Sequence, residues 1–249
     1  MSIGSSTSAK RLSRRQLLAW GLVALPAILV SPVTSRDADI PLQQVIATDF
    51  GDWRDVHLVD GSVVTVAPRT TMITHFDRNR RYIYFEGGDA LFKVMKDPSH
   101  PFIVETARAR ATALGTTFAV SHDANRTLVT TTEGLVKVSR RPYEPEQTVV
   151  ESVKVAANQQ VTVDRWAPMK VRTVDPWVEL AWTERQISFD RTWLPTAFDA
   201  FNLRNRTQIS VPNYVHALEY RVTGRFRLDD PEAFYEYVDD QLKKRALLK

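Results

Sequence analysis

Short apolar runs separated by turn sequences fill the chain from about residue 53 to residue 163. Runs of four to six residues at this regular spacing are typical of β-strands, and Asp60-Gly61 and Glu133-Gly134 are turn sequences between them. Glu86–Asp89 is also expected to be a turn, because two glycines lie at its centre. The pattern predicts strands at Val56–Val59, Val63–Val66, Tyr82–Phe85, Ala90–Val94, Phe102–Glu105, Thr117–Val120, Leu128–Thr132, Leu135–Val138, Val153–Ala156 and Gln160–Val163.

No helical period competes with this pattern before residue 175. Residues 50–165 are therefore predicted to form an all-β domain, built as a sandwich, a barrel or a stacked-strand solenoid. The protein is expected to be mainly β. Residues 164–175 are expected to be the boundary to a second domain.

The character of the sequence changes after residue 176. Leu194, Phe198 and Phe201 recur at helical spacing, and Asp230 followed by Pro231 is a favourable start for a last helix. Residues 176–249 are therefore predicted to form a small α+β domain of order β-α-β-β-α. Its predicted elements are a strand at Gln186–Phe189, a helix at Trp193–Leu203, strands at Gln208–Val211 and Glu219–Phe226, and a helix from Pro231 onward.

An apolar segment, residues 17–35, lies near the start of the chain. Residues 16–35 carry no charge, and as a helix these 20 residues would span about 30 Å, the thickness of a bilayer core. Four basic residues precede the segment and one follows it, so the positive-inside rule places residues 1–16 in the cytoplasm and exports the rest. The segment is expected to be a membrane helix. The alternative is a cleaved signal peptide, because the strongly apolar part, Leu17–Val30, is short.

The residues just before this segment resemble a twin-arginine export signal. Ser13, Arg14 and Arg15 precede Gln16-Leu17-Leu18, and the twin-arginine machinery exports folded proteins. An ordinary basic leader region is the alternative interpretation.

Charge and composition narrow the function classes. The first 36 residues hold five of the 33 Lys and Arg residues and no acid, so the rest of the chain has 28 basic and 29 acidic residues. A near-neutral body argues against a nucleic-acid partner. The absence of cysteine excludes disulfides, zinc knuckles and cysteine-held iron–sulfur clusters.

No motif for catalysis, for a metal or for a cofactor is present. The five histidines have no metal-ligand spacing, and the sequence contains no nucleophile elbow and no phosphate-binding loop. An exported protein of this kind is expected to bind or to signal rather than to be an enzyme.

Five segments, in order, resemble the FecR family. The second domain is similar to the C-terminal signalling-type domain of that family. The segments are VHLVDGSVVTV (56–66), FEGGDALFKV (85–94), DPSHPFIVET (97–106), ATALGTTFAV (111–120) and TTEGLVKV (131–138), and the C-terminal part covers residues 180–211 and 222–238.

This resemblance implies a single-span inner-membrane signal transducer of Gram-negative bacteria, with its bulk in the periplasm. The periplasmic part would contact the signalling domain of a TonB-dependent outer-membrane transporter, usually one that imports an iron chelate. The cytoplasmic end would bind an extracytoplasmic-function sigma factor and act as an anti-sigma factor or activator. Two departures are visible: only about 16 residues precede the apolar segment, too few for a domain, and the chain ends without the strand that often follows the family's last helix.

The predicted strands at Gln208–Val211 and Glu219–Phe226 suggest where partners bind. A sheet edge in the second domain would accept a strand of the partner, and Tyr214, Tyr220, Arg221 and Arg225 would supply specificity, because Tyr and Arg are favoured at interfaces. The alternative is that Tyr220 and Phe226 only fill the small core.

The FecR resemblance also implies a self-cleavage site at Gly115-Thr116, because some members of the family cut themselves at such a bond. A tight turn at Gly115 is the alternative. Two other function classes stay open from the sequence: an exported envelope- or carbohydrate-binding module without a transcriptional role, and an exported hydrolase.

Overall fold

The computed structural model describes residues 42–141, 151–212 and 219–247. The expected export signal at Ser13, Arg14 and Arg15, the apolar segment 17–35 and Tyr214 lie outside these residues. Within the described part of the chain, no helix combines the length and the hydropathy needed to cross a membrane.

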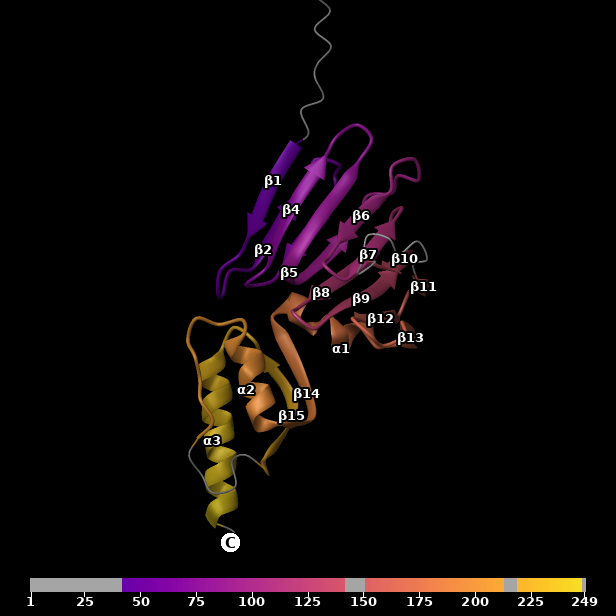
Figure 1. Cartoon of the computed structure of the whole chain (residues 1–249). Helices are drawn as coiled ribbons and strands as arrows, with labels where there is room; N and C mark the ends of the chain where they lie inside the picture. The colour runs from indigo at the N-terminus through magenta and orange to yellow at the C-terminus, as the bar shows by residue number, and fades with distance from the viewer. Residues whose placement is uncertain (1–41, 142–150, 213–218, 248–249) are drawn as a thin grey trace, which may run out of the picture. The chain divides into compact units, whose positions relative to one another are not determined.

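The all-β part is a two-layered structure in which one long strand, β5 (Arg81–Lys93), belongs to both layers (Figure 1). Neighbouring strands are antiparallel except for β5 and β6, which are parallel. The first layer has the order β1 (Leu42–Ala47), β4 (Thr71–Phe76), the first half of β5, β6 (Phe102–Glu105), β7 (Ala109–Ala113), β10 (Leu135–Arg140) and β11 (Ser152–Ala156). The second has the order β2 (Arg54–His57), β3 (Val63–Val66), the second half of β5, β8 (Thr117–His122), β9 (Arg126–Glu133), β12 (Gln159–Asp164) and β13 (Lys170–Thr173).

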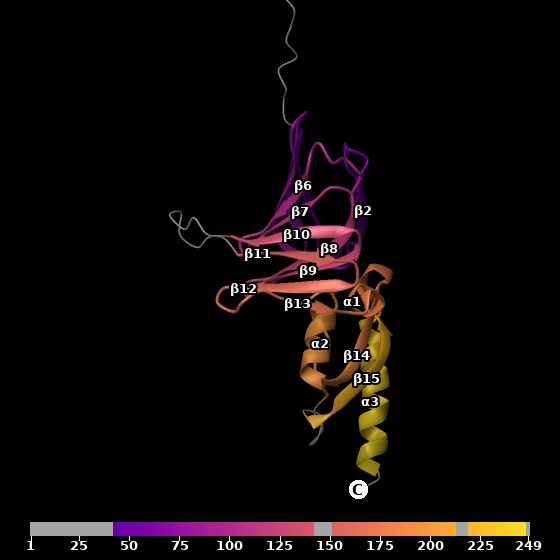
Figure 2. The same ribbon diagram turned by 90° about the vertical axis from the view of Figure 1, so that its right-hand side faces the viewer.

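One apolar core lies between the layers, which Figure 2 views nearly edge-on with β6 and β2 on opposite sides. Phe92 is at its centre: its ring lies 5.3 Å from that of Phe118 and 6.0 Å from that of Phe102, measured between ring centroids. Alternate residues of β4 point inward, so Met72 and Phe76 are buried. The core is therefore built from side chains of both layers, as in a β-sandwich.

The expected turn at Glu86–Asp89 is not a turn. β5 runs through it without interruption, pairing with β4 before Gly88 and with β8 from Gly88 onward. Gly88 has φ +102°, and a Cβ there would lie 2.6 Å from the Cα of Thr70. The glycine is needed because β5 changes layers at a point where another segment of backbone approaches it closely.

Four strands of this part were missing from the sequence-based expectation: β1, β4, β7 and β13. β1 begins before residue 50, and β13 lies within the segment expected to be a boundary. Both strands pair with the sandwich, β1 with β4 and β13 with β12. The layers thus extend from residue 42 to residue 173.

Among its described residues, the C-terminal part contains a two-stranded antiparallel sheet, two longer helices and two short helical turns, α1 and η1. Phe198 and Phe201 of α2 and Phe234 of α3 pack together with the inward face of the sheet. Asp230 caps α3, since its Oδ1 accepts a hydrogen bond from the backbone N–H of Ala233 at 3.0 Å, as expected. The elements are α1 (Pro176–Glu179), η1 (Ala181–Glu184), β14 (Gln186–Trp193), α2 (Leu194–Asn202), β15 (Arg221–Arg227) and α3 (Pro231–Leu247).

The predicted strand at Gln208–Val211 does not form. The Asn202 side chain takes the place of a neighbouring strand: its Nδ2 donates to the carbonyl of Ile209, and its Oδ1 accepts from the Ile209 N–H, both at 2.8 Å. Gln208 also donates to the backbone carbonyls of Asn202 and Asn205. The segment is satisfied by side chains, so among the described residues the order is β-α-β-α rather than β-α-β-β-α.

Gly88→Ala should destabilise the protein by about 3 kcal/mol or more, because the new methyl group meets the Thr70 backbone and the φ angle is unfavourable. Gly51→Ala is the matched control: Gly51 also has a positive φ, +72°, but nothing lies within 4 Å of its Cβ position. That variant should lose only about 1 kcal/mol. Urea unfolding of both variants measures the difference, and equal losses would contradict the proposed close approach.

Candidate functional site

The two-stranded sheet of the C-terminal part has open edges. β14 and β15 pair with each other, and neither has a second partner strand among the described residues. Ile187, Phe189 and Val222 point to the helices, whereas alternate residues of β15 point the other way and are exposed. Those outward residues are Arg221, Thr223, Arg225 and Arg227. The sheet therefore offers both unpaired backbone groups and a row of arginines.

Arg221 and Arg225, two expected partner-binding residues, both lie on this outward face. The guanidinium of Arg221 lies 3.9 Å from the ring centroid of Trp193 and donates to the carbonyl of Arg191. Arg225 is exposed and makes no ion pair with another described residue. Arg227 differs from it, because its guanidinium pairs with Asp229 at 2.9 Å.

Tyr220 lies in a different environment. Its side chain is half-buried and packs against the core of the C-terminal part. Burial raises the pKa of its hydroxyl above the ordinary value. This placement favours the alternative interpretation, in which Tyr220 is mainly a core residue.

Gly115 and Thr116 lie in the connection between β7 and β8. Gly115 has φ +143°, and a Cβ there would lie 2.6 Å from the Cα of Lys96, so the glycine is needed for packing. The carbonyl of Thr116 accepts a hydrogen bond from Val94 at 2.9 Å. The Thr116 hydroxyl is buried and has no hydrogen-bond partner among the described residues. A buried hydroxyl without a partner is unusual. Here it directly follows Gly115, whose φ angle other residues rarely adopt.

The sequence analysis missed a buried arginine of β5, Arg81. Arg81 is 5% exposed and forms an ion pair with Asp60 at 3.2 Å. Its guanidinium also donates to the carbonyls of Met95, Asp97 and His100 at 2.7 to 3.0 Å. Alternation along β5 was the available signal, because Arg81 belongs to the same inward series as Ile83 and Phe85. These contacts hold the β2–β3 turn and the β5–β6 connection against the sandwich.

Polar and aromatic contacts join the sandwich to the C-terminal part. Arg204, just after α2, pairs with Asp89 of β5 at 2.8 Å, and the side chains are 15% and 14% exposed. The N–H of Gly51 donates to the carbonyl of Arg204 at 2.8 Å. The rings of Trp53 and Trp182 stack with their centroids 6.3 Å apart.

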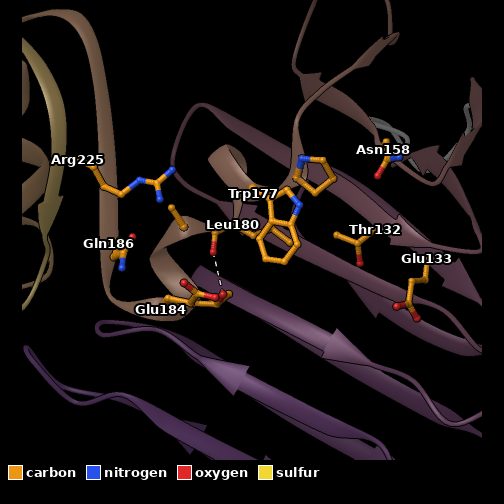
Figure 3. A pocket seen from close by; sticks show the side chains of 11 residues that line it. Thr132, Glu133, Asn158, Trp177, Leu180, Glu184, Gln186 and Arg225 are labelled. Atoms are coloured by element: carbon orange, nitrogen blue, oxygen red, sulfur yellow. Dashed lines mark hydrogen bonds between the residues drawn. The ribbon is translucent and has the colours of Figure 1, made fainter.

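A pocket of about 360 Å³ lies between the β9–β10 region and the C-terminal part. Figure 3 shows the indole of Trp177 at its centre, with Arg225 and Gln186 on one side and Thr132 and Glu133 on the other. Trp177 is 78% exposed despite its size. The lining residues are Thr132, Glu133, Asn158, Pro176, Trp177, Leu180, Ala181, Thr183, Glu184, Gln186 and Arg225.

The described residues contain no group of three or more histidine, aspartate or glutamate side chains that would hold a metal ion. The pocket lining contains two carboxylates, Glu133 and Glu184, and one arginine. Its chemistry is that of hydrogen bonding and aromatic contact.

Comparison with known structures identifies similar folds. The chain is similar to two crystal structures of a protein from Parabacteroides distasonis ATCC 8503 that is proposed to be an anti-sigma factor. The 2.50 Å structure has a TM-score of 0.63 and 25% identity, covering 80% of this chain and 92% of that one. The 1.65 Å structure has a TM-score of 0.62 and 26% identity, covering 80% and 91%.

Sequence comparison gives one family. No curated protein matches the chain significantly. The profile of the FecR protein family matches residues 44–137, which run from β1 to β10 and include four of the five segments that suggested the resemblance in full and nearly all of the fifth. This match confirms the resemblance of the chain to the FecR family over residues 44–137.

Proposed function

We propose that this protein regulates an extracytoplasmic-function sigma factor and relays to it the state of a TonB-dependent outer-membrane transporter. The FecR domain and the similarity to a proposed anti-sigma factor support the role in sigma-factor regulation. The charge pattern of residues 1–36 supports a single inner-membrane span with the described residues in the periplasm. In this scheme the periplasmic part binds a protein and is not an enzyme for a diffusible substrate.

The observation that carries the proposal is the open β14–β15 sheet with its outward arginines. A strand of the transporter's periplasmic signalling domain pairs with one of its edges through main-chain hydrogen bonds. Arg221 and Arg225 then bind acidic side chains of that strand or of its neighbours. Arginine beside an aromatic ring, as with Arg221 on Trp193, is a frequent centre of binding energy at interfaces.

A second part of the proposal concerns maturation. The Thr116 hydroxyl oxygen attacks the carbonyl carbon of Gly115, the peptide C–N bond breaks, and the released Thr116 amine takes up the proton. Water then hydrolyses the ester, which leaves a Gly115 carboxylate and restores the Thr116 hydroxyl. The unpartnered Thr116 hydroxyl supports this step, because no hydrogen bond to a described residue holds it away from the reaction.

The double variant Arg221→Glu, Arg225→Glu should bind the signalling domain at least tenfold more weakly, since charge reversal turns attraction into repulsion; tenfold is about 1.4 kcal/mol. The measurement is titration calorimetry with the purified periplasmic signalling domain of the TonB-dependent transporter proposed as the partner. Raising the salt concentration should weaken wild-type binding and strengthen binding by the double variant, because salt screens attraction in the first and repulsion in the second.

The control variant is Lys137→Glu, Lys154→Glu, which makes the same change of net charge at two exposed residues paired across β10 and β11. It should bind like the wild type. Wild-type affinity in the arginine double variant would contradict a contact at this face.

Thr116→Ala should abolish cleavage between residues 115 and 116, whereas Thr116→Ser should retain it, because serine keeps the nucleophilic oxygen. Mass spectrometry of the protein isolated from the cell envelope detects the two fragments. An intact wild-type chain, or cleavage that persists in the alanine variant, would refute the reaction.

A further inference from the structure

The Trp177 pocket contains polar groups without partners. The side chains of Asn158, Glu184, Gln186 and Arg225 line it, and none forms a hydrogen bond or ion pair with another described residue. Most charged side chains near it are paired, as Arg172 is with Glu179 and Arg185 with Asp229. Four unpaired polar side chains around one hollow are what a ligand site requires, because they are free to bond a ligand.

The backbone of Trp177 is held by a capped turn. Asp175 caps α1, and its Oδ1 accepts a hydrogen bond from the backbone N–H of Trp177 at 3.0 Å. Pro176 fixes the first position of the turn. Trp177 therefore projects from a short, capped turn, and its ring lies at the centre of the lining residues (Figure 3). An exposed indole provides a large apolar contact surface together with one N–H donor.

The chemistry of the lining selects the class of ligand. The amides of Asn158 and Gln186 both donate and accept hydrogen bonds, as hydroxyl and acetamido groups do. Glu133 and Glu184 accept hydrogen bonds, and Arg225 donates them. The opposite charges leave no dominant sign, which disfavours a strongly charged ligand. The flat indole matches the apolar C–H face of a pyranose ring.

We propose that this pocket binds an uncharged glycan segment built from N-acetylated hexosamine units, with Trp177 stacked on one sugar ring. Asn158, Gln186 and Glu184 bind its hydroxyl and acetamido groups. This site shares Arg225 with the proposed arginine contact to a transporter, but binding of the glycan needs neither a sigma factor nor a transporter. It would fix the exported part of the chain to a polysaccharide of the cell envelope.

The test uses the full chain in detergent and the tetrasaccharide of β-1,4-linked N-acetylglucosamine as the probe, with calorimetry and tryptophan fluorescence. The wild type should bind, and Trp177→Ala should bind at least tenfold more weakly. Glu184→Gln, which removes a charge but keeps a hydrogen-bonding group, should lose less. Trp166→Ala is the matched control, because Trp166 is 82% exposed but does not line the pocket.

Two results would overturn the inference: absence of binding by the wild type, or equal losses in the Trp177 and Trp166 variants. Arg221→Glu separates this inference from the proposed function, because it should weaken binding of the signalling domain and leave binding of the tetrasaccharide unchanged.

Discussion

The sandwich depends on one strand that pairs in both of its layers. β5 pairs with β4 and β6 in the first layer and with β3 and β8 in the second, so its path fixes how the two layers face each other. The change of layer occurs at Gly88, where the Thr70 backbone leaves no room for a side chain. Phe85 and Phe92, on either side of this point, both enter the same core. A glycine thus sets the geometry that the apolar side chains then stabilise.

The same point of β5 also reaches the C-terminal part. Asp89 follows Gly88 and forms the largely buried ion pair with Arg204. A buried pair adds little net stability over an apolar contact, but loss of one partner costs about 3 to 5 kcal/mol because the other charge stays behind. We therefore interpret this ion pair as a contact that favours one arrangement of the residues near the β14–β15 sheet and the Trp177 pocket. Its net contribution to the free energy of unfolding is small.

The sequence predicted most strands and both longer helices because their side chains follow a clear period. It missed β7 and β13, which consist of small or exposed residues, Ala-Arg-Ala-Thr-Ala and Lys-Val-Arg-Thr, and gain their order from neighbouring strands. The opposite error arose at Gln208–Val211, where the Asn202 amide replaces a strand. Gly87 and Gly88 were interpreted as a turn. The change of layer at this point depends on the approach of the Thr70 backbone, a contact between residues far apart in the sequence.

The candidate site was predictable to a similar extent. Arg221 and Arg225 were proposed from the sequence, and alternation along β15 places both on its outward face, which is local information. The Trp177 pocket was not predicted, because it gathers residues from β9, the β11–β12 turn, α1, η1 and both strands of the small sheet. Arg81 escaped notice for the same reason, since its partners come from two separate connections, β2–β3 and β5–β6.

In the proposed function, the β14–β15 sheet with its outward arginines binds another polypeptide, and the regulatory role follows if that contact changes transcription. The most direct measurement is the activity of a promoter that depends on the sigma factor this protein is proposed to regulate, read in cells that express the wild type or a chain lacking residues 176–249. The account predicts that the wild type changes promoter activity when the transporter's ligand is added and that the truncated chain abolishes this response. An unchanged response in the truncated strain would contradict it.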